Sequence, residues 1–123
     1  MNKENDIAPN EKLIILADGN TRQVGMLMDT IKRICPVYLD SSYCEEKSEY
    51  FYLAKNIRNF LEEKDKKILI IRYSGNKKIA KEIGDRISQI VIQISFDRES
   101  IFYTKKPIEI TIDMIRAFIK EKN

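Results

Sequence analysis

Two short apolar runs, each followed by a glycine-asparagine pair, constrain the fold of this chain more than any other feature. The first is Lys12–Ala17 (KLIILA), which ends at Asp18-Gly19-Asn20, and the second is Ile68–Ile71 (ILII), which Ser74-Gly75-Asn76 follows. Continuous apolar runs of this length are typical of strands that are covered on both faces, as in parallel sheets. The sequence therefore predicts an α/β domain built around buried parallel strands.

Segments with a helical spacing of apolar residues follow these runs. Thr21 is the expected N-cap of the first helix, and Pro36 closes that helix. Further helices are expected to start near Ser48 and after Asn76, and a last helix closes the chain. Their inward-facing stripes comprise Val24, Leu27, Met28, Ile31 and Ile34 in the first; Tyr50, Leu53, Ala54, Ile57, Phe60 and Leu61 in the second; Ile79, Ala80, Ile83 and Ile87 in the third; and Ile112, Ile115, Phe118 and Ile119 in the last.

The remaining extended segments are shorter or less uniform. Val37–Leu39 is expected to be a second strand that ends at the turn-forming cluster Asp40-Ser41-Ser42. Gln89–Ser95 alternates in polarity, which predicts a fourth strand that is less fully covered than the first and third. Ile101–Thr104 and Ile108–Thr111 are expected to be two short extended pieces before the closing helix.

Strands that alternate with helices favour parallel pairing through right-handed crossovers. We therefore expect a three-layer, doubly wound, Rossmann-like sheet that is mostly parallel, with the strand order 2-1-3-4, a C-terminal extended segment and a closing helix. Residues 1–11 contain Pro9 and several charges and are expected to form a flexible leader. Residues 12–123 are expected to form a single domain, because a chain of 123 residues has the length of one ordinary core.

The composition excludes several classes of function. Histidine is absent, which removes the commonest metal ligand, the usual general base and the phosphohistidine route. The 22 basic and 19 acidic residues are mixed along the chain, so a nucleic-acid partner is not expected. No apolar run in the sequence has membrane-spanning length, and the N-terminus is polar. We therefore expect a cytoplasmic protein without a membrane partner. Cys35 and Cys44 lack the spacing of a zinc or redox motif and are expected to be reduced thiols.

The candidate binding site comprises the loops after the first and third strands, which are alike. One loop contains Asp18, Gly19, Asn20, Thr21 and Arg22, and the other contains Ser74, Gly75, Asn76 and Lys77. At the carboxyl edge of a parallel sheet, such loops offer backbone N–H groups, hydroxyls and cations to an anion. The same residues also suit a tight turn and a helix cap without any ligand.

Catalytic or metal chemistry is less well supported by these residues. Asp18 and Asp40 are both expected to end strands, so a magnesium-dependent enzyme is conceivable, but acidic caps and turns explain each residue equally well. The chain has no Gly-x-Ser-x-Gly elbow, and a serine triad would lack its base. We therefore assign no catalytic residue, no metal ligand and no cofactor.

The segment Leu13–Thr21 resembles the first-strand motif of flavodoxins, in which a Thr-Gly-Asn-Thr loop wraps the phosphate of FMN. Gly19, Asn20 and Thr21 match that motif, whereas Asp18 places a negative charge where the phosphate would lie. The chain also has no tryptophan to stack on a flavin.

Residues 12–95 also resemble the enzyme IIA domain of mannose-type sugar phosphotransferase systems and the related dihydroxyacetone kinase phosphotransfer subunit. Asp18-Gly19 stands at the His-Gly position of those domains, and Tyr73-Ser74-Gly75-Asn76 stands near their Asp-x-Gly-Ser loop. The resemblance implies a degenerate relative without the phosphoacceptor histidine. It also implies a homodimer in which an extended C-terminal segment, here 101–111, adds to the neighbour's sheet.

These observations lead to two functional expectations. The first is a non-catalytic regulatory or protein-interaction domain of IIA-like architecture, whose partner is another protein or a second copy. The alternative is a small-ligand module that binds a phosphate-bearing molecule, such as a nucleotide or FMN, at the two loops.

Overall fold

In the computed structural model, strands and helices alternate along the chain. The structure describes residues 10–35, 39–43, 50–73 and 77–122. In chain order the elements are β1 (Leu13–Asp18), α1 (Thr21–Ile34), β2 (Leu39–Tyr43), α2 (Tyr50–Glu62), β3 (Ile68–Arg72), α3 (Ala80–Ile87), β4 (Ile90–Ser95) and α4 (Pro107–Lys122). The expected α/β class is confirmed.

The four strands form one parallel sheet in the order β2-β3-β1-β4. The expected order 2-1-3-4 is therefore corrected, because β3 lies between β2 and β1. Both orders place β1 and β3, the most continuously apolar strands, in the two central positions, where both faces are covered. The difference lies in the crossovers: α1 carries the chain from β1 past β3 to β2, and α3 carries it from β3 past β1 to β4. The alternating β4 and the polar β2, which contains Asp40, Ser41 and Ser42, take the edges.

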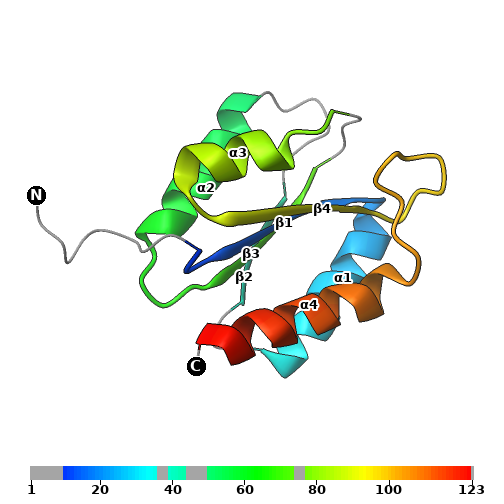
Figure 1. Cartoon of the computed structure of the whole chain (residues 1–123). Coiled ribbons are helices and arrows are strands. Elements are labelled where there is room, and N and C mark those ends of the chain that lie inside the picture. Colours follow the sequence, from blue (N-terminus) through cyan, green and yellow to red (C-terminus); the bar gives the residue numbers. More distant parts are fainter. Residues whose placement is uncertain (1–9, 36–38, 44–49, 74–76, 123) are drawn as a thin grey trace, which may run out of the picture.

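Two helices cover each face of this sheet, which gives the expected three layers (Figure 1). The face under α1 and α4 buries Leu13, Ile15 and Ala17 of β1, and the face under α2 and α3 buries Ile14 and Leu16. Alternate residues of one strand thus feed two separate cores. Each fully buried Leu or Ile side chain contributes about 1.5–3 kcal/mol.

The N-cap of α1 and the last buried residue of its stripe each differ by one position from the prediction. Asn20, not Thr21, is the N-cap, because its side chain accepts a hydrogen bond from Gln23 N while Gln23 Oε1 accepts one from Asn20 N. At the other end Ile34 is 40% exposed and Cys35 is buried. With 100° between successive residues, Cys35 lies near the centre of the buried stripe and Ile34 lies at its margin.

The C-terminal region was the least accurate part of the prediction. The segment 108–111 is helical, not extended, because Pro107 begins α4 and its fixed φ suits the first helical position. Ile108, Thr111 and Ile115 then recur at helical spacing toward the core. In the other expected piece, 101–104, the only bridge described joins Tyr103 to Ser95. The closing helix itself is confirmed, whereas the C-terminal extended segment is not.

Two other predicted boundaries need comment. Asp40, Ser41 and Ser42 do not form a turn after the second strand, because they pair with Leu69, Ile70 and Ile71 inside β2. Ser48, the expected start of the second helix, lies outside the described residues, as do residues 1–9 of the expected leader. No helix in the described ranges is long and apolar enough to cross a membrane.

Lys12 is a buried cation at the amino end of β1, with only 2% of its surface exposed. Its Nζ donates hydrogen bonds to Phe60 O (2.7 Å) and Glu63 O (2.6 Å) at the end of α2, and lies 4.5 Å from the centre of the Phe60 ring. The carbonyls at a helix C-terminus carry partial negative charge, so a cation there is favourable even though Phe60 O and Glu63 O also accept backbone hydrogen bonds. Lys12 thus attaches α2 to the sheet.

We expect Lys12→Met to destabilise the fold by about 3 kcal/mol, because it keeps the apolar stem but leaves two carbonyls without their charged donor. Chemical denaturation measures the change. Lys67→Met is the matched control, since Lys67 pairs with the half-exposed Glu11 and such a pair contributes at most about 1 kcal/mol. Equal losses in the two variants would contradict this role for Lys12.

Candidate functional site

The carboxyl ends of β1 and β3 lie side by side, where the chain turns to opposite faces of the sheet. β1 leads to α1 on one face, and β3 leads to α3 on the other (Figure 1). The pairing extends beyond the strands, because Tyr73 N donates to Ala17 O at 3.0 Å. Ligands of open α/β sheets bind at such a switch point. Ser74, Gly75 and Asn76 of the second expected loop lie outside the described residues.

Asp18 ends β1 and is half-buried against the end of β4. Its Oδ2 accepts a hydrogen bond from Ser95 Oγ at 3.0 Å, and Ser95 Oγ in turn accepts one from Asp97 N at 3.0 Å. Ser95 is completely buried. The contact was missed from the sequence, which gives no sign that β4 lies beside β1. Through this hydrogen bond, one carboxylate oxygen of Asp18 connects the end of β1 to the end of β4.

Gly19 is required by a close approach and not by an unusual backbone conformation. The described residues with positive φ are Asn10, Ser88 and Lys106, so Gly19 and Asn20 are not left-handed. A Cβ atom at Gly19 would lie 3.0 Å from Phe96 Cδ2 and 3.1 Å from Gln23 Oε1. The Phe96 side chain therefore lies against the first loop.

The start of α1 has its N–H groups only partly available. Gln23 N is taken by the Asn20 side chain, and Asn20 N is taken by Gln23 Oε1. Thr21 and Arg22 are exposed at the same helix end. The capping role of Asn20 is thus observed, while Thr21 and Arg22 remain on the surface where an anion could reach them.

The start of α3 is capped by Gln93 from the neighbouring strand β4. Gln93 Oε1 accepts hydrogen bonds from Ile79 N (3.0 Å) and Ala80 N (3.1 Å), and its Nε2 donates to Lys77 O (3.3 Å). This amide occupies the position that an anion would take at a helix N-terminus. In the sequence, the indication of this capping is Gln93 itself, a polar residue between Ile92 and Ile94 in the alternating run 89–95.

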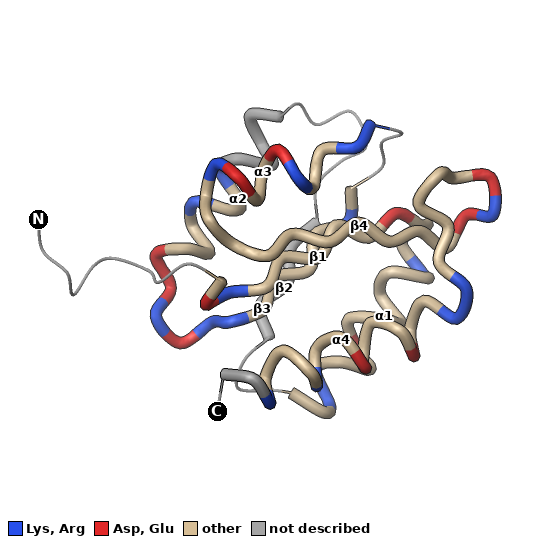
Figure 2. The backbone as a smooth tube through the Cα atoms, in the orientation of Figure 1, with Lys and Arg blue, Asp and Glu red and all other residues tan. Residues whose placement is uncertain are grey.

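Arg72 is a further cation of this site and is not among the residues predicted from the sequence. It ends β3, is half-buried, and donates from Nε to Gly19 O at 2.9 Å. Arg72 therefore ties the first loop to the end of β3. Arg22 and Lys77, which follow β1 and β3, are exposed, so three cations lie at or after these two strand ends, together with Asp18. Figure 2 shows basic and acidic residues interspersed at this end of the domain.

The other groups considered for chemistry lie apart from this site. Asp40 lies within β2, and β3 separates that strand from β1 and Asp18. Within the part of the chain that the structure describes, no three Cys, Asp or Glu side chains are placed to hold a metal ion. Burial raises the pKa of the Cys35 thiol, and the charge of Arg116 partly offsets that rise, so Cys35 is a poor nucleophile at neutral pH.

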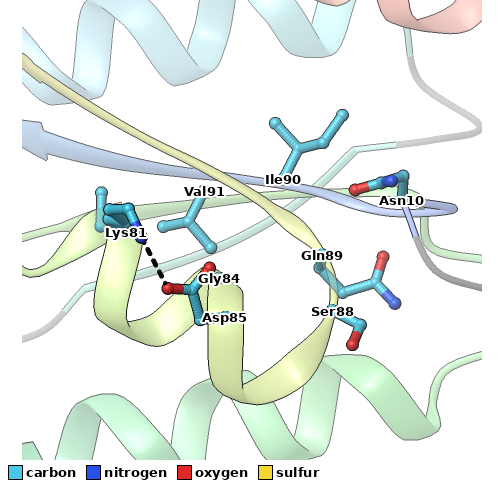
Figure 3. A pocket seen from close by; sticks show the side chains of 9 residues that line it. Asn10, Lys81, Gly84, Asp85, Ser88, Gln89, Ile90 and Val91 are labelled. Carbon is cyan, nitrogen blue, oxygen red and sulfur yellow. Dashed lines mark hydrogen bonds and ion pairs between the residues drawn. The ribbon is translucent and has the colours of Figure 1, made fainter.

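A hollow of about 500 Å³ lies between α3 and β4, toward the amino end of β4 (Figure 3). Asn10, Lys81, Gly84 and Val91 are among the residues that line it. It is thus separate from the switch point, and none of the predicted site residues lines it.

Comparisons with protein-family models, with curated proteins and with solved structures found no match to this chain. Chemically, the site offers three cations, one carboxylate that is partly engaged, and two helix ends that are largely capped by the chain itself. This arrangement can hold the loops in place and bind a polar group, and it presents no activated nucleophile among the described residues.

We expect Gly19→Ala to destabilise the protein by about 1–3 kcal/mol, because the new methyl group overpacks against Phe96. The free energy of unfolding in urea measures the loss. Phe96→Leu in the same chain should recover part of it, since the smaller side chain can move away. A loss that Phe96→Leu leaves unchanged would locate the strain elsewhere.

Proposed function

We propose that this chain is a non-catalytic regulatory or protein-interaction domain. The observation that carries the proposal is that three large apolar side chains are exposed within ten residues, in the segment that connects β4 to α4 and in the first turn of α4. Ile101 is 71% exposed, and Tyr103 and Ile110 are also exposed. Grouped exposed apolar side chains mark protein interaction sites more often than single ones do.

The switch-point geometry supports the same proposal. Gln93 caps α3, Asn20 caps α1, and Phe96 lies against Gly19, so the chain's own side chains fill much of the place that a small ligand would use. The resemblance to mannose-type IIA domains agrees with a binding role. Asp18, which replaces the phosphoacceptor histidine of those domains, is held by Ser95. The C-terminal strand exchange of those domains has no counterpart in 108–111, which is helical.

We expect Ile101→Ser combined with Ile110→Ser to abolish recovery of the proteins that the wild-type chain enriches from its native cells, without loss of stability. Quantitative mass spectrometry of affinity-purified complexes measures the recovery. Lys55→Ser, at an exposed site on α2, is the matched control and should retain the partners.

Two results would contradict the proposal. One is a partner set that does not depend on Ile101 and Ile110. The other is covalent phosphate on Asp18 after incubation with a phosphohistidine carrier protein, detected by intact-protein mass spectrometry and absent in Asp18→Asn.

A second candidate function is favoured by Arg72 alone. This half-buried guanidinium lies between the first loop and the end of β3, and its Nη atoms suit a phosphate group. The domain would then bind a small phosphate-bearing molecule, such as a nucleotide or FMN, with help from Arg22 and Lys77.

This candidate predicts that the protein is purified with a bound nucleotide or chromophore, and that Arg22→Ala or Lys77→Ala weakens binding about tenfold by removing one charge-assisted contact. Calorimetric titration with FMN, nucleotides and inorganic phosphate measures the affinity. Lys55→Ala is the distant control. Ligand-free, colourless preparations that bind none of these molecules would exclude it.

A further inference from the structure

β4 is an edge strand whose outer side carries backbone groups for a further strand. It pairs with β1 on its inner side only. Phe96 N donates inward to Asp18 O, whereas Ser95 O accepts outward from Thr104 N. Because backbone groups alternate in direction along a strand, Val91 and Gln93 direct their N–H and C=O groups outward. Within the described ranges, the pairing recorded on that outer side is the one at Ser95.

This edge lacks the features that usually prevent pairing. The sequence of β4 is Ile-Val-Ile-Gln-Ile-Ser, with no charge and no proline. Edge strands of soluble proteins commonly carry Lys, Pro or a bulge, because a flat apolar edge pairs with other chains. Thr104 already pairs at Ser95, which leaves Ile90–Ile94 as the open stretch.

Both flanks of the open stretch are suited to contact. On the α3 side, exposed Lys81 and Asp85 form a 3.0 Å ion pair above the hollow beside Val91 (Figure 3). On the α4 side, Met114 packs against the same core cluster as Ile90 and Ile92. The same helix carries exposed Ile110 one turn before Met114.

We propose that a second copy of this chain pairs with β4 in antiparallel orientation, about a two-fold axis perpendicular to the sheet at Ile92. Val91 then pairs with Gln93 of the second copy, and Gln93 with its Val91, which gives about four hydrogen bonds. Such an axis keeps like faces together, so Ile90 and Ile94 of the two copies extend one apolar layer. This inference names a partner for the proposed function and rests on it.

The charges and the chain path fit this occupant. Lys81 and Asp85 form an ion pair on this flank of each copy, so each flank is neutral and no net charge opposes the pairing of two copies. Ser88, with a left-handed φ of 57°, turns the chain from α3 into β4 and ends the paired stretch below Ile90. The strand is already ordered, so pairing requires less loss of conformational entropy than the docking of a flexible peptide.

Amide hydrogen exchange, measured residue by residue by NMR together with sedimentation equilibrium, tests the proposal. We expect a concentration-dependent dimer in which exchange at Val91 and Gln93 slows at least roughly tenfold as the dimer forms. Ile92 and Ile94, which bond inward to β1, should be protected at every concentration. Val91→Pro removes an outward N–H that the sheet does not use, and should give a folded monomer.

A charge swap provides a test that leaves the strand unchanged. Lys81→Asp should weaken the dimer several-fold, because it leaves four acidic side chains on the two flanks beside the axis. Lys81→Asp with Asp85→Lys should restore it, because each flank is then neutral again. A monomer at all concentrations, with fast exchange at Val91 and Gln93, would overturn the inference. So would a dimer that persists in Val91→Pro with the Gln93 amide unprotected. Neither result would contradict the proposed interaction function, which is tested separately by the recovery of partners that depend on Ile101.

Discussion

The parallel pairing of β1 with β3 is the interaction on which the rest of this structure depends. Leu13 to Ala17 and Ile68 to Ile71 are fully buried, so each residue of the pair contributes to one of two cores. Helices α1 and α4 pack against one face of the pair, and α2 and α3 pack against the other. The switch point exists because these two adjacent strands send their loops to opposite faces.

The sequence predicts most of the strands and helices, because the spacing of apolar residues within a segment reflects which of its faces are buried. The apolar runs of β1 and β3 and the stripes of α1 and α4 were recognisable, since burial on two faces or one imposes a period on the sequence. The order of the strands in the sheet cannot be predicted in this way, because the spacing of apolar residues in one strand does not identify the strand that pairs with it. The polar residues of β2 were an available signal for an edge, but they were interpreted as a turn. Pro107 was interpreted as a break between extended pieces, although the same residue suits the first turn of a helix.

The candidate site shows the same division between local and long-range information. Asn20 as a cap and the loop after β1 follow from residues within one turn. The contacts of Asp18 with Ser95, of Gly19 with Phe96 and of Arg72 with Gly19 O join segments more than fifty residues apart. The first two contacts require β4 to lie beside β1, so a prediction with the order 2-1-3-4 could not contain them. The Arg72 contact is compatible with that order, but no local pattern indicates which carbonyl the guanidinium contacts. Lys12 was missed for a related reason, because a lysine that begins an apolar run is ordinarily expected in solvent.

Gln93 has a consequence that extends beyond capping. Its main chain belongs to the outer edge of the sheet, while its side-chain amide holds the first N–H groups of α3 and the carbonyl of Lys77. Gln93 therefore connects the edge strand β4 to the segment that leads from β3 into α3. Any displacement of β4 would be transmitted through these hydrogen bonds to the start of α3 at the switch point.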